Sequence, residues 1–222
     1  MSLTFDLATG RKAFTESVTA FVEAVDAVDE WDLLSASRCH GWTRLDVVVH
    51  VLAGWQEMLG GMVSPVDDAP TVDAASYWTA FADSEAGDPL LTLMAQRRRA
   101  MAYPRPAAAI EQLQDVADAV HRGAAGLSDR HVTWQGQVFT PGDFLVVWAV
   151  EDVIHHLDLD ADRHPGAGPP PIALDLGRAT VEALAAPFPD GWSAQDVVLV
   201  GTGREPVPDS LGSLAARLPA LG

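Results

Sequence analysis

One segment, residues 140–160, constrains the fold most, because it predicts a long helix that carries a carboxylate and an imidazole on one face. Thr140 and Pro141 form a typical helix start, in which a capping side chain precedes the residue best suited to the first helical position. Glu151 and His155 follow at a spacing of i,i+4, which places them one above the other. Such a pair can hold one divalent metal, although the pattern also occurs by chance on solvated helices.

A third ligand must come from elsewhere, and His50 is the best candidate. It lies in the otherwise apolar run 45–53, where a buried histidine needs a polar partner. Its predicted helix, 42–59, also has a well-defined start, because Thr43 can cap it and Asp46 stands at the third position to cap back. Capped helix starts of this kind would fix where each helix begins, and therefore where its candidate ligand lies along the helix axis.

Other polar residues have ordinary explanations beside functional ones. Asp158 lies at i+3 from His155 and shares the face of the pair, so it can orient a ligand histidine, yet a solvated acid at a helix end looks the same. His121 is the reserve third ligand, although its place beside an apolar stripe suits a boundary histidine. His156 points away from the face and is assigned no role. Arginines 97–99 are the one local basic cluster, which fits a solvated helix end better than contact with an anionic substrate.

Amphipathic periodicity predicts a mainly α fold of the four-helix-bundle type. In such bundles metal sites are built from inward side chains of facing helices. The long helices are expected at residues 9–28, 42–59, 110–127 and 140–160.

A proline-rich linker, residues 167–171, divides the chain. Residues 1–166 are expected to form the metal-binding bundle, and residues 167–222 a small α/β extension packed on it. A capping pattern at 192–196 competes with the run of valines behind it, and β propensity favours the strand there. The extension is therefore expected to contain two helices and one strand, at residues 172–186, 210–218 and 197–200.

Composition excludes several function classes. The formal net charge of −17, from 31 acidic and 14 basic residues, argues against binding nucleic acid or an anionic membrane. No apolar run approaches the roughly 20 residues of a membrane span, and no signal peptide is evident, so a cytoplasmic protein is expected. The sequence shows neither a glycine-rich phosphate loop after a strand nor a Gly-x-Ser-x-Gly elbow, which disfavours nucleotide chemistry and a serine hydrolase.

Two motifs and the C-terminal residues carry a family resemblance. They are Gly41-Trp42-Thr43 with Asp46 and His50, Glu151-x-x-x-His155-His156-Leu157-Asp158, and the ending Gly201-Thr202-Gly203-Arg204 with Leu218-Pro219. Together they resemble the metal-binding domain of the mycothiol-dependent maleylpyruvate isomerase family, within the DinB-like superfamily of four-helix bundles. The resemblance implies a divalent metal, usually zinc, on His50, Glu151 and His155. The isomerase is expected to have a larger C-terminal domain than the residues after Pro171 supply.

The implied ligand set predicts a catalytic rather than a structural metal. Two neutral imidazoles and one carboxylate leave a divalent ion one positive charge and at least one open position. A thiol can bind there as thiolate, because a metal ion lowers its pKa. Cys39 is the only cysteine of the chain, so the sulfur is expected from a cofactor such as mycothiol. The leading hypothesis is a thiol-dependent transferase or cis/trans isomerase that acts on a small electrophilic substrate.

Three alternatives stay open on sequence alone. The metal can instead activate water, which would make the protein a hydrolase. The bundle can be a non-catalytic module that binds a metal, a small molecule or a partner. Lastly, the three polar residues can form a satisfied core network without metal. The sequence also leaves open the electrophile, the thiol, the metal in the cell and the oligomeric state, with a homodimer among the options.

Overall fold

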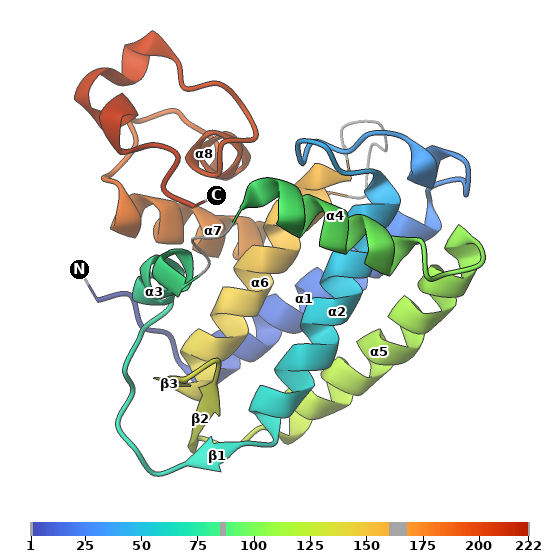
Figure 1. Ribbon diagram of the computed structural model, residues 1–222. Helices are drawn as coiled ribbons and strands as arrows, with labels where there is room; N and C mark the ends of the chain where they lie inside the picture. The colour runs from blue at the N-terminus through green and yellow to red at the C-terminus, as the bar shows by residue number, and fades with distance from the viewer. Residues whose placement is uncertain (1, 85–87, 160–167, 222) are drawn as a thin grey trace.

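Four long helices form the body of the protein (Figure 1). The computed structural model describes residues 2–84, 88–159 and 168–221. Within these ranges the helices are α1 (Leu7–Asp26), α2 (Arg44–Met62), α5 (Pro106–Gly126) and α6 (Pro141–Asp158). The mainly α fold predicted from the periodicity is therefore confirmed, and each helix buries its apolar stripe in one continuous core.

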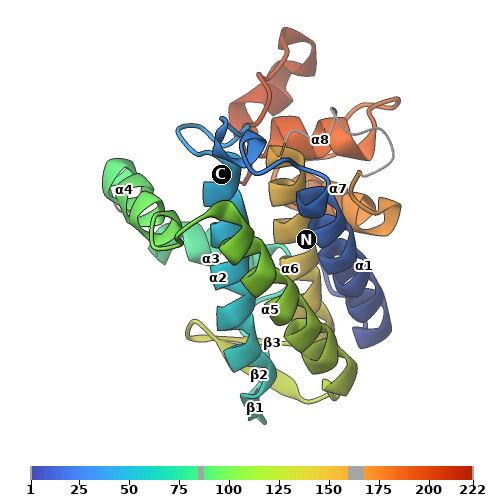
Figure 2. The same cartoon turned by 90° about the vertical axis from the view of Figure 1, so that its right-hand side faces the viewer.

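The helices differ in how closely they pack on one another, and the wider separation of α2 from α6 leaves space for a site between them. α1 packs chiefly on α6, and α2 chiefly on α5, whereas α2 and α6 approach one another less closely (Figure 2). The tight α1–α6 contact depends on glycine: a Cβ at Gly142 would collide with the backbone of Phe5 and Asp6, and one at Gly10 with the backbone of Gly142. Side chains from α2 and α6 therefore meet across a wider space than those from α1 and α6.

The two predicted helix starts are formed, but their reciprocal bonds differ. At α2 the Thr43 hydroxyl accepts from the Asp46 N–H at 3.1 Å, and the Asp46 carboxylate accepts from the Thr43 N–H at 2.8 Å, which is a complete capping box. At α6 the Thr140 hydroxyl likewise accepts from the Asp143 N–H, at 3.1 Å. The Asp143 carboxylate instead accepts from the N–H of Phe5, at 2.8 Å, and so ties the N-terminal segment to this helix.

A small antiparallel sheet lies at one end of the bundle, and two shorter helices lie along its side (Figure 1). Strand β2 occupies residues that the sequence pattern leaves as a loop, because strands of three or four residues give little alternation to detect. The sheet order is β1-β2-β3. The elements are η1 (Asp32–Leu34), β1 (Pro65–Val66), α3 (Ser76–Ser84), α4 (Pro89–Ala100), β2 (His131–Trp134) and β3 (Gln137–Phe139).

The C-terminal part is helical over its described residues, so the predicted strand at 197–200 is wrong. It comprises α7 (Pro171–Leu184), which packs on α6, then α8 (Ala194–Gly201) and η3 (Asp209–Arg217). Ser193 caps α8 by accepting from the Asp196 N–H at 3.1 Å. The cap and the burial of the valines among helices outweigh β propensity, which is a weak preference. The expected boundary at 166/167 and the expected helix end at Asp160 lie outside the described residues.

Candidate metal centre

Three side chains predicted as ligands converge between α2 and α6. His50 projects from α2, and Glu151 and His155 project from successive turns of α6. The Nε2 atom of His50 lies 3.3 Å from Oε1 of Glu151, and Nε2 of His155 lies 3.2 Å from the same oxygen. One donor atom from each residue lies within 4.8 Å of the other two. The structure thus brings together all three residues that the sequence singled out.

These distances fit a metal ion held by all three residues. Bonds of about 2.0–2.2 Å at tetrahedral angles place neighbouring donor atoms about 3.3–3.5 Å apart. The two observed spacings to Glu151, 3.3 and 3.2 Å, agree with that figure to within a few tenths of an ångström. Nitrogen and carboxylate donors together also form the ligand set typical of zinc. The residues present therefore fit the metal that the sequence analysis expects, by spacing and by donor type.

Asp158 fixes the orientation of His155. Its carboxylate is completely buried and accepts a hydrogen bond from Nδ1 of His155 at 3.0 Å. With the proton on Nδ1, the lone pair of Nε2 faces His50 and Glu151, as a ligand histidine requires. This contact is the one expected of the supporting residue proposed from the i+3 spacing.

Arg204 holds Asp158 in turn, and sequence reasoning missed this contact. Its Nε and Nη2 atoms donate to the two Asp158 oxygens at 3.1 and 3.0 Å. A third bond, from Nη1 to the Thr202 carbonyl at 3.0 Å, fixes the guanidinium to the turn after α8. The signal in the sequence was the Gly201–Arg204 motif, which marked a resemblance but did not indicate what the arginine touches. Residues beyond α7 therefore contribute to the centre.

Trp42 and Cys39 also lie close to the centre, and residue spacing alone does not indicate these contacts. The Trp42 ring stacks on His155, with centroids 6.4 Å apart and planes 6° apart, and meets His50 edge-on at 5.1 Å. Burial, and then the Asp158 carboxylate, raise the pKa of Cys39 to about 11. In the metal-free protein Cys39 is therefore a neutral thiol at physiological pH.

The charges of the centre are strongly coupled. Burial alone would lower the pKa of His155, but the carboxylates of Glu151 and Asp158 outweigh it and raise this pKa to about 9. Burial would likewise raise the pKa of Glu151, yet the two imidazoles hold it well below its usual range. For His50 burial dominates, so its pKa is lowered despite Glu151. Without metal, His155 is thus an imidazolium and His50 a neutral imidazole at pH 7.

This charge state predicts how the stability of the metal-free protein depends on pH. Because the pKa of His155 rises on folding from 6.5 to about 9, its protonation stabilises the fold fully below pH 6.5. That contribution, at most roughly 3 kcal/mol, is lost as the pH rises through about 9. Because the pKa of His50 is lowered on folding, its titration affects stability only below about pH 6.5, outside the range in which His155 loses its proton.

Zinc should oppose this trend, since it replaces the proton on Nε2 of His155. We expect the zinc-induced gain in the free energy of unfolding, measured by urea denaturation, to increase between about pH 6.5 and pH 8.5. A His121→Gln variant, altered at a histidine outside the centre, should show the same increase. A zinc effect equal at both pH values would contradict the assignment of His155.

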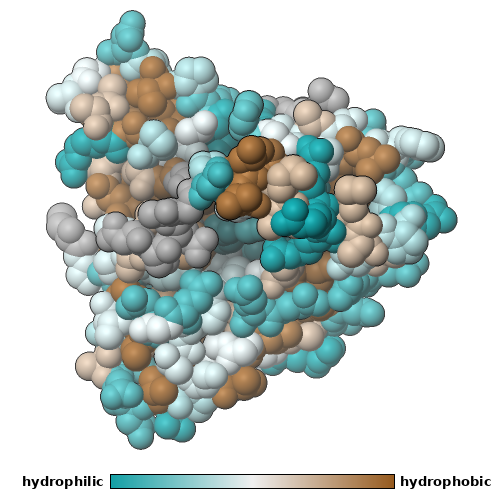
Figure 3. Space-filling view, in the orientation of Figure 1, coloured by the Kyte–Doolittle hydropathy of each residue, from teal (hydrophilic) through white to brown (hydrophobic). Residues whose placement is uncertain are grey.

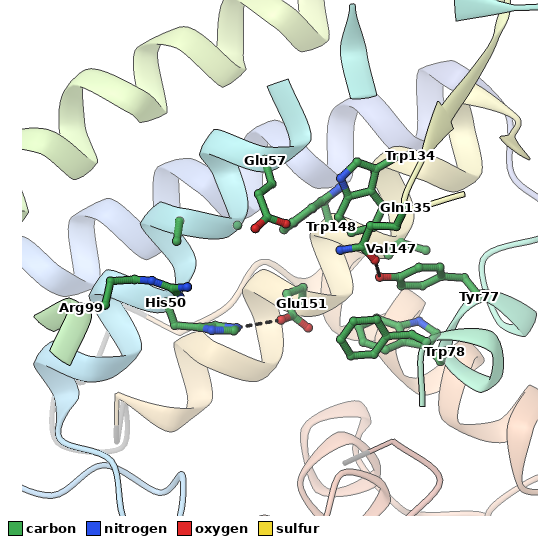
Figure 4. Close-up of a pocket in the computed structure, with 13 residues that line it drawn as sticks. His50, Glu57, Tyr77, Trp78, Arg99, Trp134, Gln135, Val147, Trp148 and Glu151 are labelled. Carbon is green, nitrogen blue, oxygen red and sulfur yellow. Dashed lines mark hydrogen bonds and ion pairs between the residues drawn. The ribbon is translucent and has the colours of Figure 1, made fainter. Parts of the chain in front are cut away.

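A pocket of about 230 Å³ opens beside the centre, between α2, α3, α4, β2 and α6. The space-filling view shows a hollow on this face of the molecule, between α3 and α4 (Figure 3). Figure 4 shows His50 and Glu151 on one side of the pocket and aromatic rings on the other. The aromatic lining residues are Tyr77, Trp78, Phe81, Trp134 and Trp148. A ligand on the open side of the triad would therefore extend over an aromatic surface.

The other polar residues noted in the sequence are placed differently. His121 lies on α5, where its Nε2 is 3.4 Å from the Thr19 hydroxyl, so the structure does not bring it to the triad. His156 is buried with its ring edge-on to Phe21. Among the arginines 97–99, Arg97 donates to the Asp46 carboxylate at 2.9 Å, while Arg99 lines the pocket.

Comparisons with known proteins agree with this architecture. Residues 13–160 match the family model described as the mycothiol maleylpyruvate isomerase N-terminal domain. The fold is similar to a crystal structure of the mycothiol-dependent maleylpyruvate isomerase, with a TM-score of 0.61, 14% identity and 90% of both chains covered. A histidine-to-alanine mutant of that isomerase gives a TM-score of 0.57 at 15% identity, again over 90% of both chains. At these identities the likeness concerns the fold alone.

The comparisons also correct one expectation and add two findings. Because the likeness covers 90% of both chains, the expectation that the isomerase has a markedly larger C-terminal domain is wrong. A comparison with curated protein sequences gives no significant match. Within the described residues, no helix combines the length and the apolar character needed to cross a bilayer.

Proposed function

This chain belongs to the family of the mycothiol maleylpyruvate isomerase N-terminal domain, and we propose that it is a metal-dependent enzyme that uses a low-molecular-weight thiol. The thiol would be mycothiol or a close relative, and the reaction S-transfer to, or cis/trans isomerisation of, a small electrophilic substrate. The observation that carries the proposal is the convergence of His50, Glu151 and His155 beside an open pocket. Zinc is the metal that this donor set suits best.

The charge of the ligand set favours a thiolate. Two neutral imidazoles and one carboxylate would leave a divalent ion one positive charge, which a single thiolate neutralises. When bound, the ion would supply the lowered thiol pKa that makes the sulfur nucleophilic at neutral pH. Cys39 is not among the described residues whose donor atoms converge at the triad, and burial raises its pKa.

The chain's own residues prepare the centre for this chemistry. Asp158 keeps the proton of His155 on Nδ1, and Arg204 keeps Asp158 in place. Trp42 holds the plane of the His155 ring by stacking on it. The aromatic wall of the pocket would shield one side of a bound substrate from water. Each of these contacts reduces the reorganisation needed when thiol and substrate bind.

Cobalt substitution tests the proposal directly. Adding mycothiol or 2-mercaptoethanol to the cobalt-loaded protein should produce a sulfur-to-cobalt charge-transfer band in the near ultraviolet. His50→Ala should lose the cobalt d–d bands and the thiol response, while His121→Ala, a matched histidine outside the centre, should keep both.

Two results would overturn the proposal. One is cobalt bound at the triad with a spectrum that no thiol perturbs. The other is a His50→Ala variant that binds cobalt as tightly as the parent, which would favour a hydrogen-bonded network without metal. The 3.2 and 3.3 Å spacings also suit such a network, so the metal titration is the necessary first step.

A further inference from the structure

The shape of the pocket beside the triad restricts what it can bind. Its volume of about 230 Å³ lies below the roughly 300–1,000 Å³ of sites for drug-sized ligands, so the occupant is small. Tyr77 and Trp78 come from α3, Trp134 from β2 and Trp148 from α6, and their rings form one wall (Figure 4). Gly54 on α2 leaves room for the Trp148 ring, which a Cβ there would meet at 2.8 Å. An aromatic wall of this kind favours a flat, apolar body.

Two buried indole N–H groups in the aromatic wall are not accessible to a ligand in the pocket. The indole N–H groups of Trp78 and Trp148 are buried and have no hydrogen-bond partner in the described structure. An indole nitrogen is only a donor, and a buried donor without a partner costs free energy. The side-chain amide oxygen of Gln135, by contrast, accepts a hydrogen bond from the Tyr77 hydroxyl at 3.2 Å. Because neither indole nitrogen is accessible from the pocket, the wall presents ring surface, rather than these donors, to a ligand.

Among the described residues that line the pocket, Arg99 is the one arginine or lysine; it is exposed to solvent and lies beside His50 (Figure 4). Its Nη1 atom donates to the neutral side-chain amide oxygen of Gln96 at 3.0 Å, and among the described residues no carboxylate pairs with Arg99. The neighbouring Arg97 is different, because it is committed to Asp46 at 2.9 Å. Arg99 therefore has donors available for an anion at the end of the pocket next to the triad.

The remaining charges disfavour a second negative group on the ligand. Glu57 and Glu151 also line the pocket, so a dicarboxylate would place its second charge near an acid or against the aromatic wall. A single carboxylate on Arg99, in contrast, leaves the adjacent carbon atoms of the ligand next to His50 and Glu151. That is where the proposed thiol chemistry takes place.

We propose that this pocket selects a planar, largely apolar electrophile with one carboxylate, such as an arylacrylate, and that Arg99 determines this specificity by binding the carboxylate. The inference rests on the proposed function for its chemistry, but the binding preference stands on the pocket alone. It assigns to one arginine of the 97–99 cluster a role that the solvated-helix interpretation does not include.

Ligand binding tests the proposal without any turnover. The probes are trans-cinnamate, its methyl ester and fumarate, each titrated into the full chain before and after chelation of metal, with tryptophan fluorescence and ligand-observed NMR as readouts. We expect cinnamate to bind at least about tenfold more tightly than either the neutral ester or the small dicarboxylate. Arg99→Gln should remove the preference for cinnamate over its ester and leave binding of the ester unchanged.

Arg98→Gln is the matched control, since Arg98 is, like Arg99, an exposed arginine of the same helix but does not line the pocket. It should bind all three probes as the parent does. The proposal is overturned if fumarate binds as tightly as cinnamate, if cinnamate does not bind at millimolar concentration, or if Arg99→Gln weakens acid and ester equally.

The outcomes also separate this inference from the proposed function. If the cobalt centre responds to thiols but the protein does not bind cinnamate, the proposed substrate specificity is wrong and the proposed thiol chemistry stands. If cinnamate binding depends on Arg99 but thiols do not change the cobalt spectrum, the proposed specificity stands and the proposed thiol chemistry is wrong.

Discussion

Replacing Glu151 by glutamine is expected to weaken zinc binding at least about tenfold, because the anionic member of the ligand set is lost. The amide keeps the shape of the side chain, so the far-ultraviolet circular dichroism should not change. The core of the bundle is apolar and continuous, so we expect the fold to persist without metal. Competition with a chromophoric chelator at pH 7.5 measures the affinity.

Glu57→Gln is the control, because Glu57 lines the same pocket without a contact to the triad histidines. It removes the same charge from the pocket and should change zinc affinity little. Glu151→His should restore a metal site with three histidines, while changing the response of bound cobalt to thiols. Equal zinc affinities for Glu151→Gln and the parent would show that this carboxylate is not a ligand.

Asp158→Ala should lower the free energy of unfolding by about 3–5 kcal/mol, because it leaves the mostly buried Arg204 guanidinium without its carboxylate. It should also lower zinc affinity about 10–100-fold, since His155 loses the acceptor that orients it. Urea denaturation of the chelated protein measures the first effect, and zinc competition measures the second. Asp67→Ala, which removes a fully exposed aspartate paired with Arg130, should cost at most about 1 kcal/mol.

The double variant Asp158→Ala/Arg204→Met separates the two roles of Asp158. Removing the guanidinium together with its partner should recover much of the lost stability, because no charge is then buried alone. Zinc affinity should stay low, since His155 still lacks its acceptor. If the double variant regained full zinc affinity, Asp158 would serve only to neutralise Arg204.

The helices and the triad were predictable because each depends on spacing within a short segment. The i,i+4 relation between Glu151 and His155 and the cap at Thr140 are local facts, and periodicity located α1, α2, α5 and α6. Joining His50 to this pair required only that two amphipathic helices face one another. The structure brings the three residues together, and their role as ligands is still a prediction.

What the sequence did not reveal depends on contacts between distant segments. Arg204 and Asp158 are 46 positions apart, and nothing near either residue indicates the other. The valines of α8 were assigned to a strand because their β propensity was weighed without the helices that bury them. Trp42 was visible as part of a motif, but that its ring stacks on His155 depends on how α2 and α6 are placed.

The link between Arg204 and Asp158 sets the order in which the centre can be completed during synthesis. The three predicted ligand residues emerge from the ribosome well before Arg204, and the bundle helices can pair once α6 has emerged. Until the turn after α8 follows, Asp158 lacks the guanidinium that fixes both of its oxygens. We therefore expect full metal affinity only after Arg204 is in place, and we expect residues 1–166 expressed alone to contain the three predicted ligands without the arginine that holds Asp158.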